Sequence, residues 1–567
     1  MYNDVLVIQK QGPGSICLIR DGEILFHISD ERISRNKYSF SPFAALKELH
    51  KFSPKIGYLY FTGYDFDKTL NEIYYSFLIS EKLVDKNVKW VEPQANHHMS
   101  HAATGFYNSG FETALCIVMD SYGSQYKMDG ELTPQYGCET SSVYLASYPD
   151  NIVCIHKNIL VDTITHHKFK EACDSEFLDK YPYPTANNIE LKKDFDIGLM
   201  YQAVSRHINF SHNECGKTMG LSAYGSYNDN IPEFINKDGD KFYSNMNIFY
   251  DKFNLNSNRY PIFKERSNIP DICYALQKAT ETLGVEFVKR MVKETGVKNV
   301  VISGGVAQNI LLNYKLIENL DKDVNLYIEP NCEDEGNSIG MAKLLWHTIS
   351  KDKTIRPLTN VYGGTTPDYS KLLLENNETC SEADYNIITD LLIEGNIVCI
   401  FQGKSEWGRR GLGNRSILLD PRILDGKDIV NKIKKREWFR PFAGTILLEE
   451  CHKWFDMKSL KESPYMMYGV PALEGVSKIV PSIIHKDNTC RIQTVTEEQN
   501  LHFYNLIKKF NDKTKVPILF NTSFNLAGEP VVESLYDALD TMRRSEMEYL
   551  YLPEIGKLVH IPNIKED

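Results

Sequence analysis

Two histidines four residues apart are the first side chains in the sequence whose spacing suits metal chemistry. His97 and His101 lie in the segment NHHMSHA, and a helix there would place both imidazoles on one face, with His98 pointing elsewhere. Asp120, which ends the apolar run ALCIVMD, and Asp334, in CEDEGNSIG, could each add a carboxylate. Such a set suits iron, manganese or zinc. A pair of helix histidines without a metal is the alternative interpretation, because this spacing alone is not specific.

A glycine pair ends another apolar run. In NVVISGGVAQN, Gly304 and Gly305 would let the backbone approach a phosphate or a ribose at the start of the next helix. The segment predicts nucleotide contacts from Gly304, Gly305 and Asn309. Taken alone, the glycine pair is better explained by an ordinary strand–turn–helix junction.

Basic residues crowd two neighbouring segments, EWGRRGLGNRSILLDPR at 406–422 and NKIKKREWFRPFAG at 431–444. They alternate with glycine, proline and aromatic residues, so we interpret them as a clamp for phosphate or carboxylate rather than as a solvated face. The basic residues are Arg409, Arg410, Arg415, Arg422, Lys434, Lys435, Arg436 and Arg440.

A polar strand end near the C-terminus is a further candidate. In FNTSFNLAGEP, Ser523 and Asn525 alternate with large apolar residues, as on a strand with one polar face. Their side chains could bind a triphosphate or its metal. A polar strand end before a glycine turn is the simpler alternative.

The elements that would position these residues follow an α/β pattern. Three short strands (VLVIQ, SICLI and EILFHI) precede a helical segment, FAALKELH. Apolar strands then lead into glycine turns and helices, where α/β proteins place their ligands. Residues 126–190 and 226–270 have weak periodicity and are interpreted as insertions or irregular surface, where we expect acceptor selectivity. A linker is expected at 350–370, and a second α/β pattern follows it.

Composition narrows the class of protein. With 567 residues, of which 42% are hydrophobic and 25% charged, the chain is long enough for more than one globular domain. The net charge of −11 argues against nucleic acid as a partner. The sequence shows neither a signal peptide nor a bilayer-spanning run, so we expect a cytoplasmic protein without membrane contact. The 12 cysteines lack a CxxC pair and are expected to be reduced thiols.

Six segments in this order resemble the NodU/CmcH family of O-carbamoyltransferases. They are NHHMSHAATGFYNSG, GKTMGLSAYG at 216–225, SGGVAQN, GRRGLGNRSILLDPR, REWFRPFAG and FNTSFNLAGEPVV. The resemblance implies an actin-like (ASKHA, duplicated ribonuclease H-like) carbamoyl-transfer domain over 1–355 and a YrdC-like α/β domain over 356–567. The second domain would form carbamoyl adenylate from carbamoyl phosphate and ATP. The first would pass the carbamoyl group to an acceptor hydroxyl, and a closed passage would shield the labile adenylate from water.

The resemblance also implies roles for single residues. The implied metal ligands are His97, His101, Asp120 and Asp334, with iron as the expected metal and Mg²⁺ accompanying ATP. The implied catalytic residues are Lys434, Arg440 and Arg410. The implied binding residues for ATP, the adenylate and carbamoyl phosphate are Ser523, Asn525, Arg410, Lys434, Arg440, Gly304, Gly305, Asn309 and Lys217. The expected partners are ATP, carbamoyl phosphate and a small-molecule hydroxyl acceptor, and a homodimer is left open.

Two departures from the family pattern bear on mechanism. Many members carry a GHD-type segment in the first strand turn, whose histidine is a candidate base. Here that stretch reads QGPGS, with Gly12 or a neighbour at the histidine's place. After Asp120 the chain has Ser-Tyr-Gly-Ser instead of Gly-x-Gly-Glu, so the groups that orient the metal ligands are expected to differ.

Two alternative functions stay open. A synthase of the tRNA threonylcarbamoyl type would share the architecture but use bicarbonate and threonine, and the acidic net charge disfavours it. A non-catalytic ATP-binding regulator would fit the missing histidine.

Overall fold

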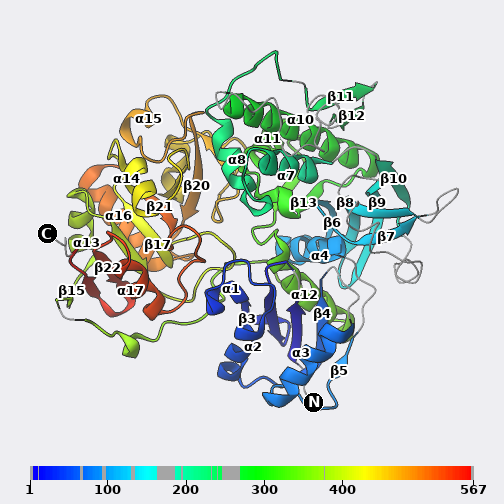
Figure 1. Cartoon of the computed structure of the whole chain (residues 1–567), viewed down its shortest axis with the longest axis horizontal. Coiled ribbons are helices and arrows are strands. Elements are labelled where there is room, and N and C mark those ends of the chain that lie inside the picture. The colour runs from blue at the N-terminus through cyan, green and yellow to red at the C-terminus, as the bar shows by residue number, and fades with distance from the viewer. Residues whose placement is uncertain are drawn as a thin grey trace. The chain divides into compact units, whose positions relative to one another are not determined.

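The computed structural model describes residues 4–10, 12–63, 68–91, 97–128, 135–161, 185–192, 196–231, 233–238, 241–245, 268–375 and 377–563. The chain divides into two compact units, and both are mixed α/β (Figure 1). Unit 1 comprises Met1–Gly12, Cys17–Glu23 and Ser53–Leu358. Unit 2 comprises Pro13–Ile16, Ile24–Phe52 and Thr359–Asp567.

The N-terminal sheet has five strands in the order β3-β2-β1-β4-β5. They are β1 (Asp4–Gln9), β2 (Ser15–Arg20), β3 (Glu23–Ser29), β4 (Ile56–Thr62) and β5 (Lys89–Trp90). The three strands predicted at the start of the chain are therefore confirmed. The central strand β1 is buried along its whole length and pairs in parallel with β4.

A second sheet, in unit 1, has the order β10-β9-β8-β6-β13-β14, with β7 paired to β8. Its strands are β6 (Thr113–Met119), β7 (Gln125–Met128), β8 (Gln135–Ser147), β9 (Asn151–Val161), β10 (Asn188–Lys192), β13 (Asn299–Ser303) and β14 (Asn325–Ile328). Strands β6 and β13 are parallel, so their carboxyl ends meet at one edge. This edge is where a ligand site is expected in such a sheet.

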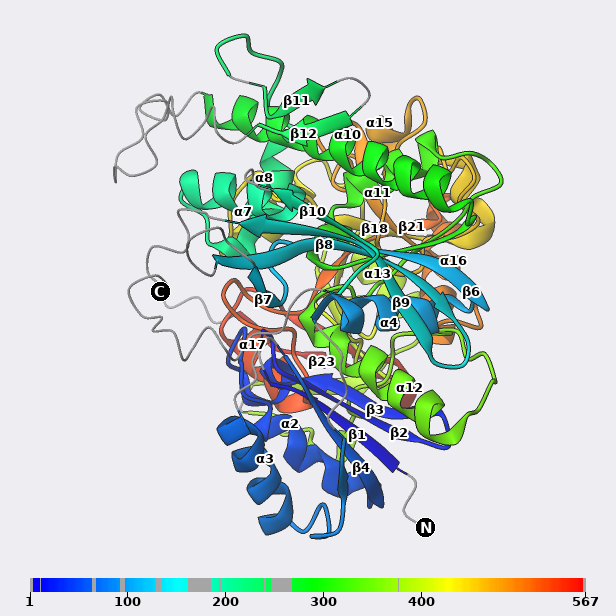
Figure 2. The same ribbon diagram turned by 90° about the vertical axis from the view of Figure 1, so that its right-hand side faces the viewer.

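Within the described residues, seven α-helices of unit 1 surround the two sheets. They are α3 (Lys68–Ser80), α4 (His97–Ser109), α7 (Ile197–His207), α8 (Cys215–Ser222), α10 (Ile269–Thr295), α11 (Ile310–Asn319) and α12 (Asn337–Ser350). Helices α4 and α12 pack together between the sheets, α12 against β1 and β4 and α4 against β6 and β13 (Figure 2). Helices α7, α8, α10 and α11 gather on the other face of the second sheet.

The interpretation of 126–190 and 226–270 as irregular surface was wrong for their described parts. The long strands β8 and β9, with β10 beside them, lie in the first stretch, and the hairpin β11 (Ile235–Asp238) and β12 (Lys241–Ser244) lies in the second. Polar residues of β8, among them Glu139 and Ser142, are buried, so the alternation that marks a strand is hidden in the sequence. Residues 162–184 and 246–267 lie outside the described residues.

Unit 2 is built on a nine-stranded sheet in the order β15-β23-β22-β16-β17-β21-β18-β20-β19. Its strands are β15 (Thr379–Glu382), β16 (Val398–Phe401), β17 (Arg415–Leu419), β18 (Ala443–Leu447), β19 (Gly469–Pro471), β20 (Thr489–Val495), β21 (Ile518–Ser523), β22 (Tyr549–Leu552) and β23 (Lys557–His560). Its helices are α1 (Asp30–Ser34), α2 (Phe43–Lys47), α13 (Tyr385–Ile393), α14 (Gly426–Ile433), α15 (Val476–Ile479), α16 (Leu501–Thr514) and α17 (Leu535–Arg543). The predicted second α/β pattern is therefore confirmed.

Other expectations concern the connection and the thiols. Residues 351–368 contain neither helix nor strand, as a linker would. Within the described residues, no helix is both long enough and apolar enough to cross a membrane. The 11 cysteines there are all free thiols. The domain limits 1–355 and 356–567 stay a prediction.

Candidate functional site

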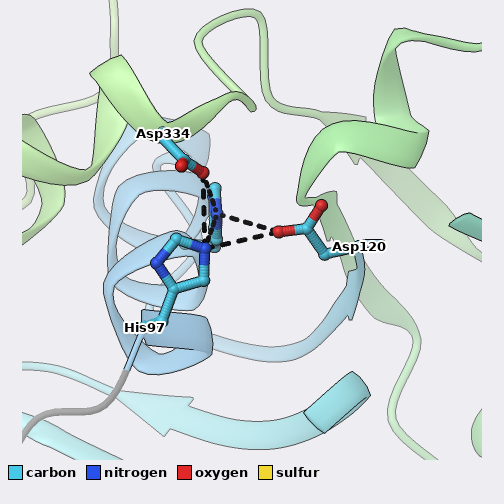
Figure 3. Close-up of side chains that lie close together, drawn as sticks. His97, Asp120 and Asp334 are labelled. Carbon is cyan, nitrogen blue, oxygen red and sulfur yellow. Dashed lines mark hydrogen bonds and ion pairs between the residues drawn. The ribbon is translucent and has the colours of Figure 1, made fainter. Parts of the chain in front are cut away.

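Four side chains of unit 1 converge at one point, and Figure 3 shows how three of them face one another. His97 begins helix α4, and His101 lies one turn further on. Asp120 directly follows strand β6, and Asp334 begins the short 3-10 helix Asp334–Gly336 that precedes α12. One nitrogen or carboxylate oxygen from each residue lies within 4.8 Å of the others. The structure thus brings together the four residues singled out from the sequence.

The separations between these atoms fit a shared cation. His97 Nε2 lies 3.3 Å from both Asp120 Oδ2 and Asp334 Oδ1. His101 Nε2 lies 3.6 Å and 3.3 Å from the same two oxygens, and the two Nε2 atoms are 3.1 Å apart. Ligands at about 2.0–2.2 Å from a tetrahedral ion lie about 3.3–3.6 Å from one another. Two imidazoles and two carboxylates are also a donor set that divalent transition metals accept.

The electrostatics of this cluster favour a positive charge. Burial lowers the pKa of His97, but the charges of Asp334 and Asp120 outweigh burial and raise the pKa to about 10. Burial raises the pKa of Asp120 and of Asp334, and the two imidazoles more than reverse this, so both carboxyls stay ionised. A proton or a metal ion can supply the charge that this site requires.

The glycine pair borders the same cluster. Gly304 has a φ of +86°, and a Cβ there would lie 2.4 Å from Met119 O, so the turn requires glycine. Gly305 N donates to Asp120 Oδ1 at 3.3 Å. Asn309 is engaged elsewhere, since its Oδ1 caps α11 by accepting from Leu312 N and also accepts from Gln277. The pair therefore lies beside Asp120, whereas the side chain of Asn309 serves the helix.

Lys217 has local partners. It lies on α8, where Nζ pairs with Glu214 Oε1 at 2.5 Å and sits 5.4 Å from the ring centre of Phe210. These contacts hold Lys217 against the turn before α8 and do not join it to the four converging side chains.

Three of the expected adenylate-site residues contact one another in unit 2. Lys434 follows α14 and is buried, and its Nζ donates to Ser523 O and, at 3.1 Å, to Asn525 Oδ1. Ser523 Oγ donates to Asn525 Oδ1 at 2.7 Å. Both oxygens that accept from Lys434 belong to uncharged groups. Burial and the neighbouring Arg436 and Arg440 lower the pKa of Lys434 well below its usual value.

Arginines gather around this lysine. Arg491, on β20, has its pKa lowered by burial and by Arg410, Arg436 and Arg440, so each of these three guanidinium groups lies close enough to repel that of Arg491. Burial and Arg440 lower the pKa of Arg436 to about 9. We call Arg410, Lys434, Arg436, Arg440 and Arg491 the basic cluster. Such a gathering of cations, with Lys434 buried and the four arginines half-buried, favours an anionic ligand.

The basic cluster includes a residue that the sequence reading missed. Arg491 stands alone in the strand TCRIQTV, most of whose residues are buried, and a single cation in such a strand was the available signal. Two other arginines of the basic segments are structural. Arg415 lies 3.8 Å from the ring centre of Phe401, and Arg422 pairs with Asp420 at 2.6 Å.

Comparison with known proteins decides the family. A family model described as the carbamoyltransferase N-terminus matches residues 47–343, and one described as the carbamoyltransferase C-terminus matches 389–557. The chain belongs to the carbamoyltransferase family. Since O-carbamoyltransferases are among its relatives, it is a transferase, and the resemblance to the NodU/CmcH family is confirmed.

Individual relatives of this carbamoyltransferase agree. The nodulation protein NolNO of Sinorhizobium fredii is 28% identical over 95% of this chain and 77% of its own length. The 3'-hydroxymethylcephem-O-carbamoyltransferase of Amycolatopsis lactamdurans is 28% identical over 57% of this chain and 61% of its own. A crystal structure of T. kodakarensis HypF is 14% identical, with a TM-score of 0.40 over 62% of this chain and 48% of that one. The last likeness is too weak to assign the fold.

Gly12 of this carbamoyltransferase lies against a residue of the candidate metal site. Its φ is +70°, and a Cβ there would lie 2.3 Å from Asp334 Oδ2. We expect Gly12→Ala to displace that carboxylate and lower divalent-metal affinity about 10- to 100-fold, because overpacking costs about 1–3 kcal/mol. Metal retained after dialysis, measured by mass spectrometry, tests this.

Gly296→Ala is the matched control for that experiment. Gly296 ends α10 in the same unit with a φ of +69°, and no atom lies within 4 Å of the added Cβ. The Gly296→Ala variant therefore introduces the same backbone strain as Gly12→Ala without a steric clash between the new Cβ and a neighbouring side chain. Equal metal retention in the two variants would contradict the role assigned to Gly12.

Proposed function

We propose that the chain is an ATP-dependent O-carbamoyltransferase that works through carbamoyl adenylate. In unit 2, water hydrolyses carbamoyl phosphate to carbamate and inorganic phosphate. An oxygen of the carbamate then attacks the α-phosphate of ATP, which forms carbamoyl adenylate as pyrophosphate leaves. In unit 1, a hydroxyl of a small-molecule acceptor attacks the carbamoyl carbon, AMP leaves, and the hydroxyl proton is released. The observation that carries the proposal is the basic cluster, in which one buried lysine and four half-buried arginines suit a ligand rich in phosphate.

The residues of unit 2 have separate tasks in this scheme. Lys434, Arg410 and Arg440 neutralise the charge that develops as pyrophosphate departs, and Arg491 adds a fourth cation to them. Ser523 and Asn525 hold Lys434 in place. Asn525 is fixed in turn, since its Nδ2 donates to Glu529 O at 2.8 Å. Mg²⁺ accompanies ATP, as in other phosphoryl-transfer reactions.

Unit 1 holds a divalent metal in this proposal, with iron as the expected ion. His97, His101, Asp120 and Asp334 would hold it, and the separations of their ligand atoms support this. A cation bound there supplies Lewis-acid chemistry toward a carbonyl oxygen. Gly305 N bonds Asp120 Oδ1 and so orients one of the four residues.

The remaining sequence predictions fit the same scheme as proposals. Gly304, Gly305, Asn309 and Lys217 would contact the nucleotide part of the adenylate. Unit 1 would correspond to an actin-like domain, which the packing of α4 and α12 between two sheets supports. Unit 2 would correspond to a YrdC-like domain, which the basic cluster, with Arg491 on strand β20, supports.

Pyrophosphate release tests the proposed function. The full chain, incubated with ATP and carbamoyl phosphate, is expected to release pyrophosphate only when both are present. Omission of either substrate is the control. A second arm with bicarbonate and threonine tests the threonylcarbamoyl alternative, and nucleotide binding without turnover would favour the regulator. Absence of pyrophosphate release that depends on both substrates contradicts the proposal.

A further inference from the structure

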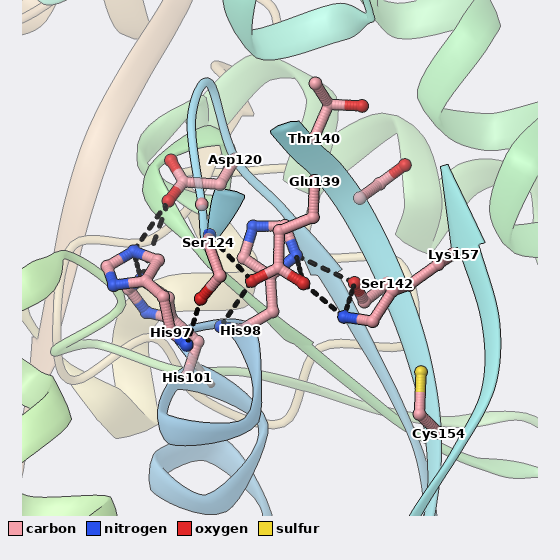
Figure 4. Close-up of polar contacts among 12 residues, drawn as sticks. His97, His98, His101, Asp120, Ser124, Glu139, Thr140, Ser142, Cys154 and Lys157 are labelled. Carbon is pink, nitrogen blue, oxygen red and sulfur yellow. Dashed lines mark hydrogen bonds and ion pairs between the residues drawn. The ribbon is translucent and has the colours of Figure 1, made fainter. Parts of the chain in front are cut away.

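A buried ion pair lies directly behind the candidate metal centre (Figure 4). Glu139 on β8 and Lys157 on β9 are both fully buried and pair with each other. Lys157 Nζ also donates to Ser142 Oγ at 3.3 Å and lies 5.2 Å from the ring centre of Tyr126. Burying two charges is expensive, so a pair of this kind calls for a reason beyond stability.

The carboxylate of Glu139 holds the start of helix α4. Its Oε1 accepts from His98 N at 3.2 Å and from Ser124 N at 2.9 Å. Ser124 Oγ accepts in turn from His97 N at 3.0 Å. The first amides of a helix have no partner within the helix. Glu139 and Ser124 therefore satisfy two of these amides where the helix places His97.

The same residue holds the loop that carries Asp120. Gly123 N donates to Glu139 O at 2.8 Å, and Glu139 N donates to Ser124 O at 3.1 Å. Asp120 N donates to the next residue of β8, Thr140 O, at 3.0 Å. Glu139 thus connects the helix that carries His97 to the loop that follows Asp120. The side chains of His97 and Asp120 lie 3.3 Å apart, from Nε2 to Oδ2.

We propose that Glu139, Lys157 and Ser124, here called the α4 clamp, are positioning residues that set His97 against Asp120. The inference rests on the proposed metal centre and names the groups that orient it. Lys157 keeps Glu139 ionised and in place, and Glu139 and Ser124 fix the backbone of the helix and the loop.

Two double variants that differ only at position 139 test the α4 clamp. Glu139→Leu with Lys157→Met replaces the ion pair by apolar residues, a change that often costs a protein little or no stability when both partners of a buried pair are replaced. It leaves the amides of His98 and Ser124 without their acceptor. Glu139→Gln with Lys157→Met also removes both charges but keeps an oxygen for those amides. The comparison isolates the hydrogen bonds from the charges.

The measurement is a Co²⁺ titration of the full chain followed by visible absorption. We expect the Leu/Met variant to bind Co²⁺ about 10- to 100-fold more weakly and with an altered spectrum, as happens when groups orienting metal ligands are lost. The Gln/Met variant should bind Co²⁺ close to the wild-type affinity. Pyrophosphate release, assigned to unit 2, should stay unchanged in both, and a general folding defect would not produce that pattern.

Two further variants complete the test. Lys343→Met removes another buried lysine, whose Nζ donates to Asn108 Oδ1 at 2.8 Å, at the C-terminal end of α4. This variant should leave the Co²⁺ affinity unchanged. Ser124→Ala leaves the ion pair intact and should weaken Co²⁺ binding, even if the Leu/Met variant does not fold. Wild-type Co²⁺ affinity in the folded Leu/Met variant or in Ser124→Ala overturns the α4 clamp. A wild-type chain that binds no divalent metal overturns the metal centre itself.

Discussion

Replacing Lys434 by alanine is expected to abolish pyrophosphate release from ATP and carbamoyl phosphate. The lysine is buried, and its Nζ is fixed by Ser523 O and Asn525 Oδ1 before any ligand arrives. A preorganised donor of this kind is worth about 10²–10³ in rate, and we expect the upper end because a bound phosphate would favour the charged form of Lys434. A coupled pyrophosphate assay at saturating ATP and carbamoyl phosphate measures the loss.

The control for this experiment lies two residues away. Lys432 is exposed in the last turn of α14, so Lys432→Ala removes a lysine without touching the basic cluster. It should retain the wild-type rate. Carbamoyl transfer from chemically prepared carbamoyl adenylate should survive in Lys434→Ala, because that step is assigned to unit 1. Equal loss of both half-reactions would contradict the division of labour between the units.

The convergence of the candidate metal ligands could be predicted largely from local spacing. His97 and His101 needed only a helix, and the sequence around them is helical from His97 onward. Asp120 needed only a strand that ends at Met119. The helix and the strand end are each determined by a few neighbouring residues, so these three side chains could be predicted from a single sequence. Asp334 is different, since it reaches the histidines across more than two hundred residues, and its place among them was implied by the resemblance to the family.

The α4 clamp could not be predicted, because it depends on strand register. Glu139 and Lys157 meet since β8 pairs with β9, with Glu139 opposite Ile159 and Ser142 opposite Lys157. A charged residue inside a strand reads as a solvated position when its partner is unknown. Arg491 escaped notice for the same reason, since its meaning comes from arginines fifty and more residues away in the chain.

The grouping of the N-terminal residues is also a tertiary property. Ile24–Phe52 belongs to unit 2, where Arg32 Nε pairs with Glu533 Oε2 at 2.9 Å. Both side chains are almost fully buried. About five hundred residues separate Arg32 and Glu533 in the chain. The local sequences around them, DERIS at 30–34 and VVES at 531–534, contain no pattern that predicts the pair. Sequence patterns gave the elements of unit 2 but not the N-terminal segment that packs with them.

Replacing His97 by alanine is expected to abolish carbamoyl transfer while sparing pyrophosphate release. The variant removes one of two ring nitrogens that face Asp120 and Asp334 and leaves the backbone N–H that bonds Ser124 Oγ. A bound cation contributes several kcal/mol to polarising a carbonyl, so we expect a loss of at least about 10³-fold in transfer. Transfer from carbamoyl adenylate to an acceptor alcohol, followed by mass spectrometry of the carbamate product, measures it.

His347→Ala separates this effect from general damage to unit 1. His347 is a buried histidine at the far end of α12, stacked on Tyr107 of α4 with ring centres 4.9 Å apart. It should lower thermal stability without abolishing transfer. Added divalent metal should raise the melting temperature of the wild type and of His347→Ala, since a ligand that binds only the folded state stabilises it. The same metal should leave His97→Ala nearly unchanged. If His97→Ala gained as much stability from metal as the wild type, the imidazole would not be a ligand, and the four converging side chains would need another explanation.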